Sequence, residues 1–197
     1  MPAFAGMTRN FLKLGKKILI LGPNGSGKTT FGRRLAKITG LPFYELDFYS
    51  WQANWVETDY DEFRQKTIEL TSLNEWIIDG NYARNQDITL PACDTVVWLD
   101  VSHYISIYRT FKRSFVRAIT GDPLWHGNRE SFRRMISKDS VLKFAFFSYK
   151  RKKRRCTLFM NEKYKDKLWV RIRNNNDAKE FWERLDNSSD ELKSSDE

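Results

Sequence analysis

The sequence predicts an α/β fold in three layers, α/β/α, with a five-stranded parallel sheet in the middle and a basic helical lid. Short apolar runs alternate along the chain with stretches in which apolar residues recur at helical spacing. A glycine-rich loop follows the first apolar run, and aspartates follow the next three. Strands that alternate with helices form parallel sheets, and ligands bind where the carboxyl ends of the strands meet. The polar residues therefore stand where a binding site is expected.

The five predicted strands are the apolar runs at residues 17–21, 42–45, 76–78, 95–99 and 169–173. Helices are predicted at about 28–39, 59–73, 102–120 and 129–154, and a last one runs from residue 176 or 177 to 185. Acidic residues at the start of the 59–73 segment suit the positive end of a helix. Gly121, followed by Asp and Pro, closes the helix at 102–120.

One folded domain is predicted, at residues 16–186, between two loose ends. A chain of 197 residues is long enough for one domain with a sizeable core. Residues 1–15 form an extension, in which either Met1 or Met7 is the start of the native chain. Residues 187–197 are acidic, polar and without aromatics, and this composition predicts a disordered tail.

The net charge of +9 indicates an anionic partner: a nucleotide, a nucleic acid or an acidic membrane surface. No apolar run is long enough to span a bilayer, and the N-terminus lacks the pattern of a signal peptide. Cys93 and Cys156 have neither pairing nor metal-ligand spacing. We therefore expect a cytoplasmic protein without a membrane partner, and the sequence leaves its oligomeric state open.

The glycine-rich loop is the most specific signal in the chain. Its sequence matches G-x-x-x-x-G-K-[ST], the P-loop or Walker A pattern, which lies between a strand and a helix. Glycines let successive backbone N–H groups point inward at a phosphate, and the helix adds its unpaired N–H groups and its dipole. The N-K-x-D motif that reads guanine is absent from the sequence, so ATP is favoured over GTP. The predicted nucleotide-binding residues are Gly22, Pro23, Asn24, Gly25, Ser26, Gly27, Lys28, Thr29 and Thr30.

Within this loop, Lys28 is predicted to hold the β- and γ-phosphates, and the Thr29 hydroxyl to ligate Mg²⁺. Asp79 ends the third predicted strand and would hold Mg²⁺ through water or orient the acceptor of the phosphate. Asp100 ends the fourth strand and is the second candidate, after Asp79, for binding the metal. Asp47 follows the second strand and is a candidate general base or acceptor ligand, or else the cap of the next turn.

Two further features of the sequence allow more than one interpretation. Trp51 and Trp55, close to Asp47, either line an acceptor pocket or pack as ordinary aromatics. The basic run 150–155, KRKKRR, either complements the negative end of its helix, binds nucleic acid or attracts anionic substrates.

The lid is predicted from arginines at four-residue spacing, which lie along one helix face. Arg109, Arg113 and Arg117 share the helix at 102–120, and Arg129 and Arg133 repeat the spacing beyond Gly121. A lid at about residues 109–155 would close over the nucleotide and place guanidinium groups, above all those of Arg109 and Arg113, on the transferring phosphoryl group. The alternative is a solvated basic face.

Five segments together resemble the bacterial FlaR-like family, called DNA topology modulation proteins, which are adenylate-kinase-like P-loop proteins. The segments are ILGPNGSGKTTFGRRLA, LDFYSWQANW, WIIDGNY, DTVVWLD and YRTFKRSFVR, within a similarity that runs from about Lys17 to Leu185. The resemblance implies a kinase-like α/β fold, with ATP on Gly22–Thr29 and lid arginines at Arg109 and Arg113. The family commonly has Pro-Arg after the aspartate of the fourth strand, where this chain has Ser102-His103.

Three functions are compatible with these features. The first is a kinase that transfers the γ-phosphate of Mg-ATP to a small molecule or nucleotide whose identity the sequence does not reveal. The second is a nucleic-acid-associated ATPase or regulator that affects DNA topology, suggested by the charge of +9 and by the run 150–155. The third is a nucleotide sensor that binds ATP without turnover. The cradle, the carboxylates and the basic lid together favour the kinase.

Overall fold

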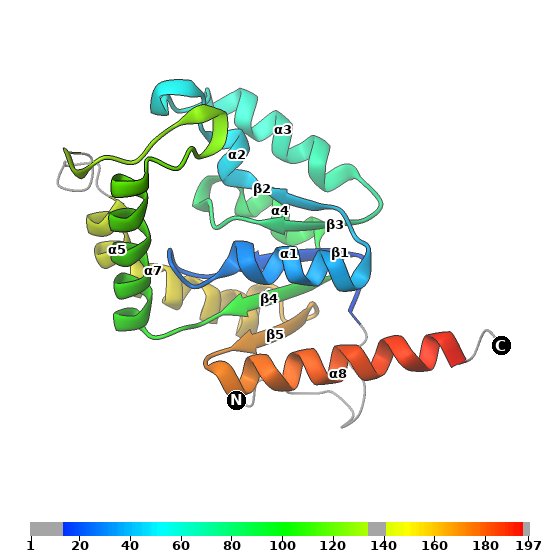
Figure 1. Cartoon of the computed structure of the whole chain (residues 1–197). Coiled ribbons are helices and arrows are strands. Elements are labelled where there is room, and N and C mark those ends of the chain that lie inside the picture. Colours follow the sequence, from blue (N-terminus) through cyan, green and yellow to red (C-terminus); the bar gives the residue numbers. More distant parts are fainter. Residues whose placement is uncertain (1–13, 134–140, 195–197) are drawn as a thin grey trace.

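The computed structural model describes residues 14–133 and 141–194, and its centre is a parallel sheet of five strands (Figure 1). The strands are β1 (Lys17–Leu21), β2 (Phe43–Glu45), β3 (Trp76–Asp79), β4 (Thr95–Leu99) and β5 (Leu168–Ile172), in the order β2-β3-β1-β4-β5. Every neighbouring pair is parallel. The predicted five-stranded parallel sheet is therefore confirmed.

Two groups of helices cover the two faces of the sheet. Successive side chains of a strand point to opposite faces. From β1, Ile18 and Ile20 pack with α1 (Lys28–Thr39) and α8 (Asn175–Ser194), whereas Leu19 and Leu21 pack on the other face. That second face is covered by α3 (Tyr60–Ser72), α4 (Gln86–Ala92) and α7 (Val141–Leu158), and also holds α2 (Leu46–Ser50). The three-layer prediction is thereby confirmed.

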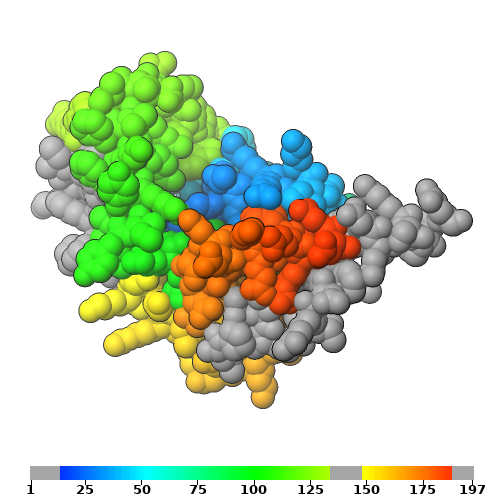
Figure 2. All heavy atoms as spheres, turned by 60° about the horizontal axis from the view of Figure 1, so that its bottom comes forward, coloured from blue at the N-terminus to red at the C-terminus, as the bar shows by residue number. Residues whose placement is uncertain are grey.

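Helix α5 (His103–Thr120) stands at the carboxyl ends of the strands and packs against α7 (Figure 1). Figure 2 shows α5 and the segment after it, in green, beside the blue residues of the P-loop region and α1. Short helical turns complete the described chain: η1 (Ala53–Trp55), η2 (Ala83–Asn85), η3 (Trp125–Gly127) and η4 (Phe159–Lys163).

The predicted helix at 129–154 is wrong at its start. Residues 121–131 instead lead away from α5 to the elements that follow β2, where the turn η3 packs against α2 and η1. Asn128 is buried there; its side chain donates to the Gln52 carbonyl at 2.8 Å and accepts from the Trp55 amide at 2.7 Å. These long-range hydrogen bonds accompany the non-helical backbone of residues 128–131, whereas residues 132 and 133 are helical and α7 spans Val141–Leu158. Residues 134–140 lie outside the described part.

Helix α8 is longer than the last predicted helix, which ended at Leu185. It continues to Ser194, past Leu185 and into the segment 187–197 that the sequence predicts to be disordered. The chain after Leu185 contains neither Gly nor Pro, so no residue forces the helix to end there. The first 13 residues, which include Met1 and Met7, and the last three lie outside the described residues. Within the described part, no helix is both long and apolar enough to cross a membrane.

The sequence also misses two short helices, α2 and α4. Helix α2 has only five residues, and α4 has seven with Pro91 inside it. Neither is long enough to show a helical period in the sequence, because a period needs at least two or three turns to be visible. Both matter for the site, since α2 carries Asp47 and α4 packs beneath the loop that follows β3.

Candidate active site

The P-loop connects β1 to α1 and has the backbone conformation of an anion cradle. Gly25 and Gly27 have φ of 73° and 91°, the left-handed region that favours glycine. A Cβ on Gly25 would also lie 2.5 Å from the Ser106 carbonyl oxygen and the Thr110 hydroxyl of α5. The first N–H groups of α1 have no partner within their helix and face the same cradle. The loop is thus shaped for phosphate and is packed directly against α5.

Thr29 and Asp79 meet because β3 pairs with β1. The register places Ile20 beside Asp79, so the last residue of β3 lies next to the start of α1. The Thr29 hydroxyl donates to Asp79 Oδ2 at 2.7 Å, and Lys28 Nζ lies 4.0 Å from Asp79 Oδ1. Burial of the carboxyl group raises the pKa of Asp79 to about 6, although Lys28 and Thr29 act in the opposite direction. A hydroxyl, a carboxylate and an ammonium therefore converge below the cradle.

Asp47 lies on α2 and forms a second polar cluster, with two hydroxyl groups. The Tyr82 hydroxyl donates to Asp47 Oδ1 at 2.5 Å and lies 2.6 Å from Ser50 Oγ. Burial, followed by the charge of Asp47, raises the pKa of Tyr82, so Tyr82 stays a hydrogen-bond donor. Asp47 is thus oriented by a neutral phenol and is not engaged as a helix cap in the manner of Asp59.

The tryptophan pair near Asp47 serves the packing of the protein. Trp51 and Trp55 contact each other edge to face, with 5.6 Å between ring centroids. The Trp55 indole donates to the Arg129 carbonyl at 3.0 Å, and this bond helps to join η1 to the segment after α5. Of the two interpretations of this pair, the packing one describes the observed contacts.

The predicted lid arginines differ in their surroundings. Arg113 is exposed on α5, and the charges of Asp47 and Asp79 are among those that act on its guanidinium. Loss of hydration, followed by repulsion from Arg117, lowers the pKa of Arg113. Arg117 itself lies 3.6 Å from Glu130. Arg109 is exposed on α5, and Arg129 is held by its backbone against Trp55. The role of Arg113 at the transferring phosphoryl group stays a prediction, which its electrostatic interaction with Asp47 and Asp79 supports.

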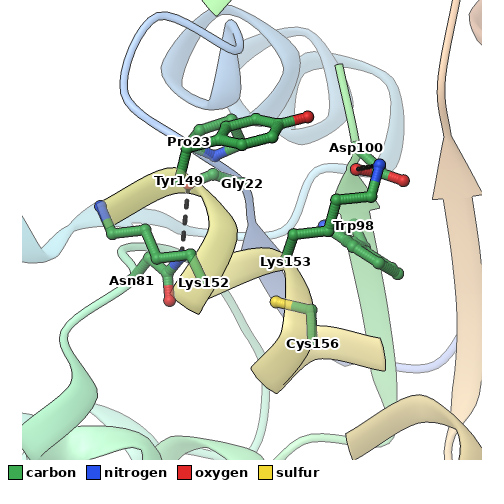
Figure 3. A pocket seen from close by; sticks show the side chains of 9 residues that line it. All are labelled: Gly22, Pro23, Asn81, Trp98, Asp100, Tyr149, Lys152, Lys153 and Cys156. Carbon is green, nitrogen blue, oxygen red and sulfur yellow. Dashed lines mark hydrogen bonds and ion pairs between the residues drawn. The ribbon is translucent and has the colours of Figure 1, made fainter. Parts of the chain in front are cut away.

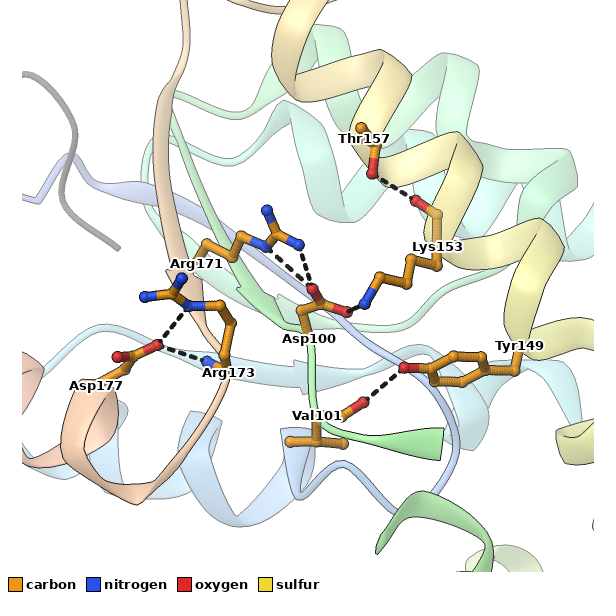
Figure 4. Close-up of polar contacts among 8 residues, drawn as sticks. All are labelled: Asp100, Val101, Tyr149, Lys153, Thr157, Arg171, Arg173 and Asp177. Carbon is orange, nitrogen blue, oxygen red and sulfur yellow. Dashed lines mark hydrogen bonds and ion pairs between the residues drawn. The ribbon is translucent and has the colours of Figure 1, made fainter. Parts of the chain in front are cut away.

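Asp100, the rival of Asp79, is occupied by two cations (Figure 4). Arg171 Nε of β5 donates to its Oδ2 at 3.0 Å, and Lys153 Nζ of α7 lies 3.1 Å from its Oδ1. Arg171 also stacks on the Trp98 ring at 4.5 Å. This cluster ties α7 and β5 to the end of β4. Asp100 is therefore a structural carboxylate.

Lys152 is a further residue near the P-loop, and the sequence did not predict this position. It belongs to the run 150–155 but is buried, and its Nζ lies 3.3 Å from Asn24 Oδ1 of the P-loop. Figure 3 shows it beside a small cavity beneath the loop, with Gly22, Asn81, Tyr149 and Cys156 among the lining residues. One signal for this position is present in the sequence. Lys152 lies three residues after Tyr149 and four before Cys156, so the three residues share one face of the helix, which the two less polar ones mark as the inward face.

Oxygen ligands for a magnesium ion are present, as the residues predict. Thr29 and Asp79 offer a hydroxyl and a carboxylate, and Mg²⁺ prefers such ligands and keeps several waters. The described residues contain no group of three or more His, Cys, Asp or Glu side chains able to hold a metal. The site therefore suits an ion that arrives with phosphate oxygens and water as its remaining ligands.

Comparisons with known proteins agree with this geometry. The family model of the ATPase family associated with various cellular activities (AAA) matches residues 18–100. A curated shikimate kinase from Parabacteroides distasonis is 50% identical over 34 residues, which are 17% of this chain and 20% of that kinase. The chain thus spans only a fifth of the length of this relative.

Two solved structures are similar over almost the whole chain. A gluconokinase from Sinorhizobium meliloti 1021 has a TM-score of 0.52 and 15% identity, covering 93% of this chain and 97% of that chain. A shikimate kinase from Bacteroides thetaiotaomicron has a TM-score of 0.50 and 16% identity, covering 91% and 98%. This chain has the P-loop kinase fold. At such identities the likeness concerns the fold, and activity has to be argued from the site.

Proposed function

We propose that this chain is an ATP-dependent phosphotransferase that passes the γ-phosphate of Mg-ATP to a small acceptor bearing a hydroxyl group. The observation that carries the proposal is the contact of 2.7 Å between the Thr29 hydroxyl and Asp79, beside Lys28 and at the mouth of the cradle. Two groups with affinity for Mg²⁺ and one for phosphate are thus assembled in one place. The kinases that share the fold support the same reaction class.

In this proposal each site residue has a distinct task. Lys28 and the amides of Gly22–Thr30 bind the phosphates, and Thr29 and Asp79 hold Mg²⁺, which would neutralise charge on the phosphate oxygens. Arg113, whose guanidinium interacts electrostatically with both carboxylates, stabilises charge on the transferring group, with Arg109 as a second lid cation that approaches on closure. Most of the rate enhancement then comes from positioning and charge neutralisation.

The acceptor is proposed to bind at Asp47. Its carboxylate is oriented by the Tyr82 hydroxyl and stands on α2, beside the turn η3 that the chain brings across from α5. A carboxylate held in this way can accept a proton from an acceptor hydroxyl as general base, or only bind it. Both possibilities predict an acceptor with a free hydroxyl group, which includes metabolites and nucleosides.

The test is phosphoryl transfer from Mg-ATP to a panel of sugars, hydroxy acids, nucleosides and nucleotides, followed as ADP release. We expect at least one acceptor to stimulate ADP release and Lys28→Ala to abolish the stimulation. Lys37→Ala is the matched control, because Lys37 is exposed near the end of the same helix. If Lys28→Ala and Lys37→Ala behave alike, the proposal is wrong.

The nucleic-acid alternative receives less support from the geometry. Two residues of the run 150–155 are engaged within the protein, because Lys152 turns to the P-loop and Lys153 pairs with Asp100. We also propose, on the segments quoted above, that the chain is a member of the FlaR-like family, within one kinase-like domain at about residues 16–186. If this chain phosphorylates a metabolite, that activity would assign a chemical reaction to the FlaR-like family.

A further inference from the structure

We propose that Lys152 is a second lysine of the phosphate site: its amine binds the nucleotide phosphates together with Lys28, and it takes up a proton when the nucleotide binds. The inference rests on the nucleotide binding proposed above and adds to it a residue from α7. Neither the P-loop pattern nor the arginine spacing of the lid includes this position.

The first argument is the position of Lys152 against the P-loop. Its Nζ lies 3.3 Å from Asn24 Oδ1, and the carbonyl of the same Asn24 accepts a hydrogen bond from Ser106 of α5. Asn24 is therefore held by its side chain from α7 and by its main chain from α5. The tip of the loop sits between these two helices, so a change at Lys152 reaches the amides that would bind phosphate.

The second argument is the charge around the buried amine. Only 8% of Lys152 is exposed, and Lys28 is the charged group that acts on it most strongly. Two ammonium groups that repel each other near an anion cradle are stabilised when a polyphosphate lies between or beside them. The charged and titratable groups around the amine are Lys28 of the P-loop, Asp47 of α2, Asp100 after β4, and Tyr149, Arg151, Lys153, Arg155 and Cys156 of α7.

The third argument concerns protons. Burial, and then repulsion from Lys28, lowers the pKa of Lys152 to about 8. Near pH 8, a substantial fraction of the free protein therefore carries a neutral Lys152. A bound polyphosphate favours the charged form and raises this pKa, so binding is accompanied by proton uptake. Asp79, with a pKa of about 6, is already ionised at this pH and contributes little.

The experiment is calorimetric titration of Mg²⁺ and ATPγS into the full chain at pH 8, in two buffers with different ionisation enthalpies. For the wild type we expect uptake of up to about half a proton per bound nucleotide, seen as a buffer-dependent heat. Lys152→Met should bind about ten-fold more weakly and without proton uptake. Lys152→Arg should recover most of the affinity, also without proton uptake, because arginine stays protonated.

Lys150→Met is the matched control, since Lys150 is exposed two residues earlier on the same helix and the substitution removes the same charge. It should bind and take up protons as the wild type does. Unchanged affinity in Lys152→Met, or unchanged proton uptake in Lys152→Arg, would overturn the inference while leaving the kinase proposal intact. Absence of any binding heat in the folded wild type would remove both. Should Lys152→Met fail to fold, the comparison of wild type with Lys152→Arg still decides.

Discussion

Asp79 and Asp100 occupy equivalent places in the sheet and have different surroundings. Each follows or ends a strand that flanks β1, and both are buried, with 6% and 7% exposed. Asp79 meets a hydroxyl at 2.7 Å and an ammonium at 4.0 Å, whereas Asp100 is held by Arg171 and by Lys153. A carboxylate at the carboxyl end of a strand is thus a candidate ligand-binding group. Whether it is available to a ligand depends on the side chains that surround it.

The largest expected difference between the two aspartates is in activity. Asp79→Asn should reduce phosphoryl transfer from Mg-ATP at least about 100-fold, because an amide cannot replace a carboxylate beside Thr29 and the metal. Asp100→Asn should change it less than about five-fold at a temperature where the variant is folded. ADP release measures both. Equal losses would mean that Asp100 also belongs to the site.

The second difference is in stability. Asp100→Asn should lower the free energy of unfolding by about 2–4 kcal/mol, because Arg171 and Lys153 would lose their charged partner in a buried position. Urea unfolding at pH 7.5, followed by circular dichroism, gives the value. An unchanged unfolding midpoint would show that the cluster does not tie α7 and β5 to β4.

Asp79→Asn should have the opposite effect on stability, with a defined pH dependence. Burial raises the pKa of Asp79 from 3.8 to about 6, so the folded state disfavours the ionised form. The stability this group contributes is present below pH 4 and is lost as the pH rises through 6. The variant should therefore be more stable than the wild type by about 1–3 kcal/mol at pH 8 and by almost nothing near pH 4. A constant difference across this range would contradict the assignment.

The smallest effect is expected for Lys153→Met. Its side chain is 44% exposed, so water screens its attraction to Asp100, and Arg171 remains as a partner. The free energy of unfolding should fall by no more than about 1 kcal/mol, and the loss should shrink further in high salt. A loss as large as that of Asp100→Asn would make Lys153, and not Arg171, the main partner of Asp100.

Much of the fold follows from local patterns. The five apolar runs are the five strands within one or two residues, because buried strands of a parallel sheet are apolar on both faces. The P-loop and its position between strand and helix follow from fixed spacing. The non-helical backbone of residues 128–131 could not be predicted, because it depends on hydrogen bonds from Asn128 to residues more than 70 positions away.

The site was predictable where its chemistry is carried by neighbours in sequence. Lys28 and Thr29 are adjacent, and their proposed roles follow from the motif. The choice of Asp79 over Asp100 depends on Arg171 of β5, which approaches Asp100 only because the sheet places β5 beside β4. The tasks of the basic run 150–155 likewise depend on which side of α7 faces the P-loop.

By itself, the sequence determined that a parallel sheet ends in a phosphate cradle, because strands, glycines and helix starts act over a few residues. Only the tertiary structure showed that Asp100 is paired with Arg171 and Lys153, and that Lys152 of the basic run reaches Asn24 of the cradle. Those outcomes depend on strand order and on helix rotation, and these are set by packing between residues far apart in the chain.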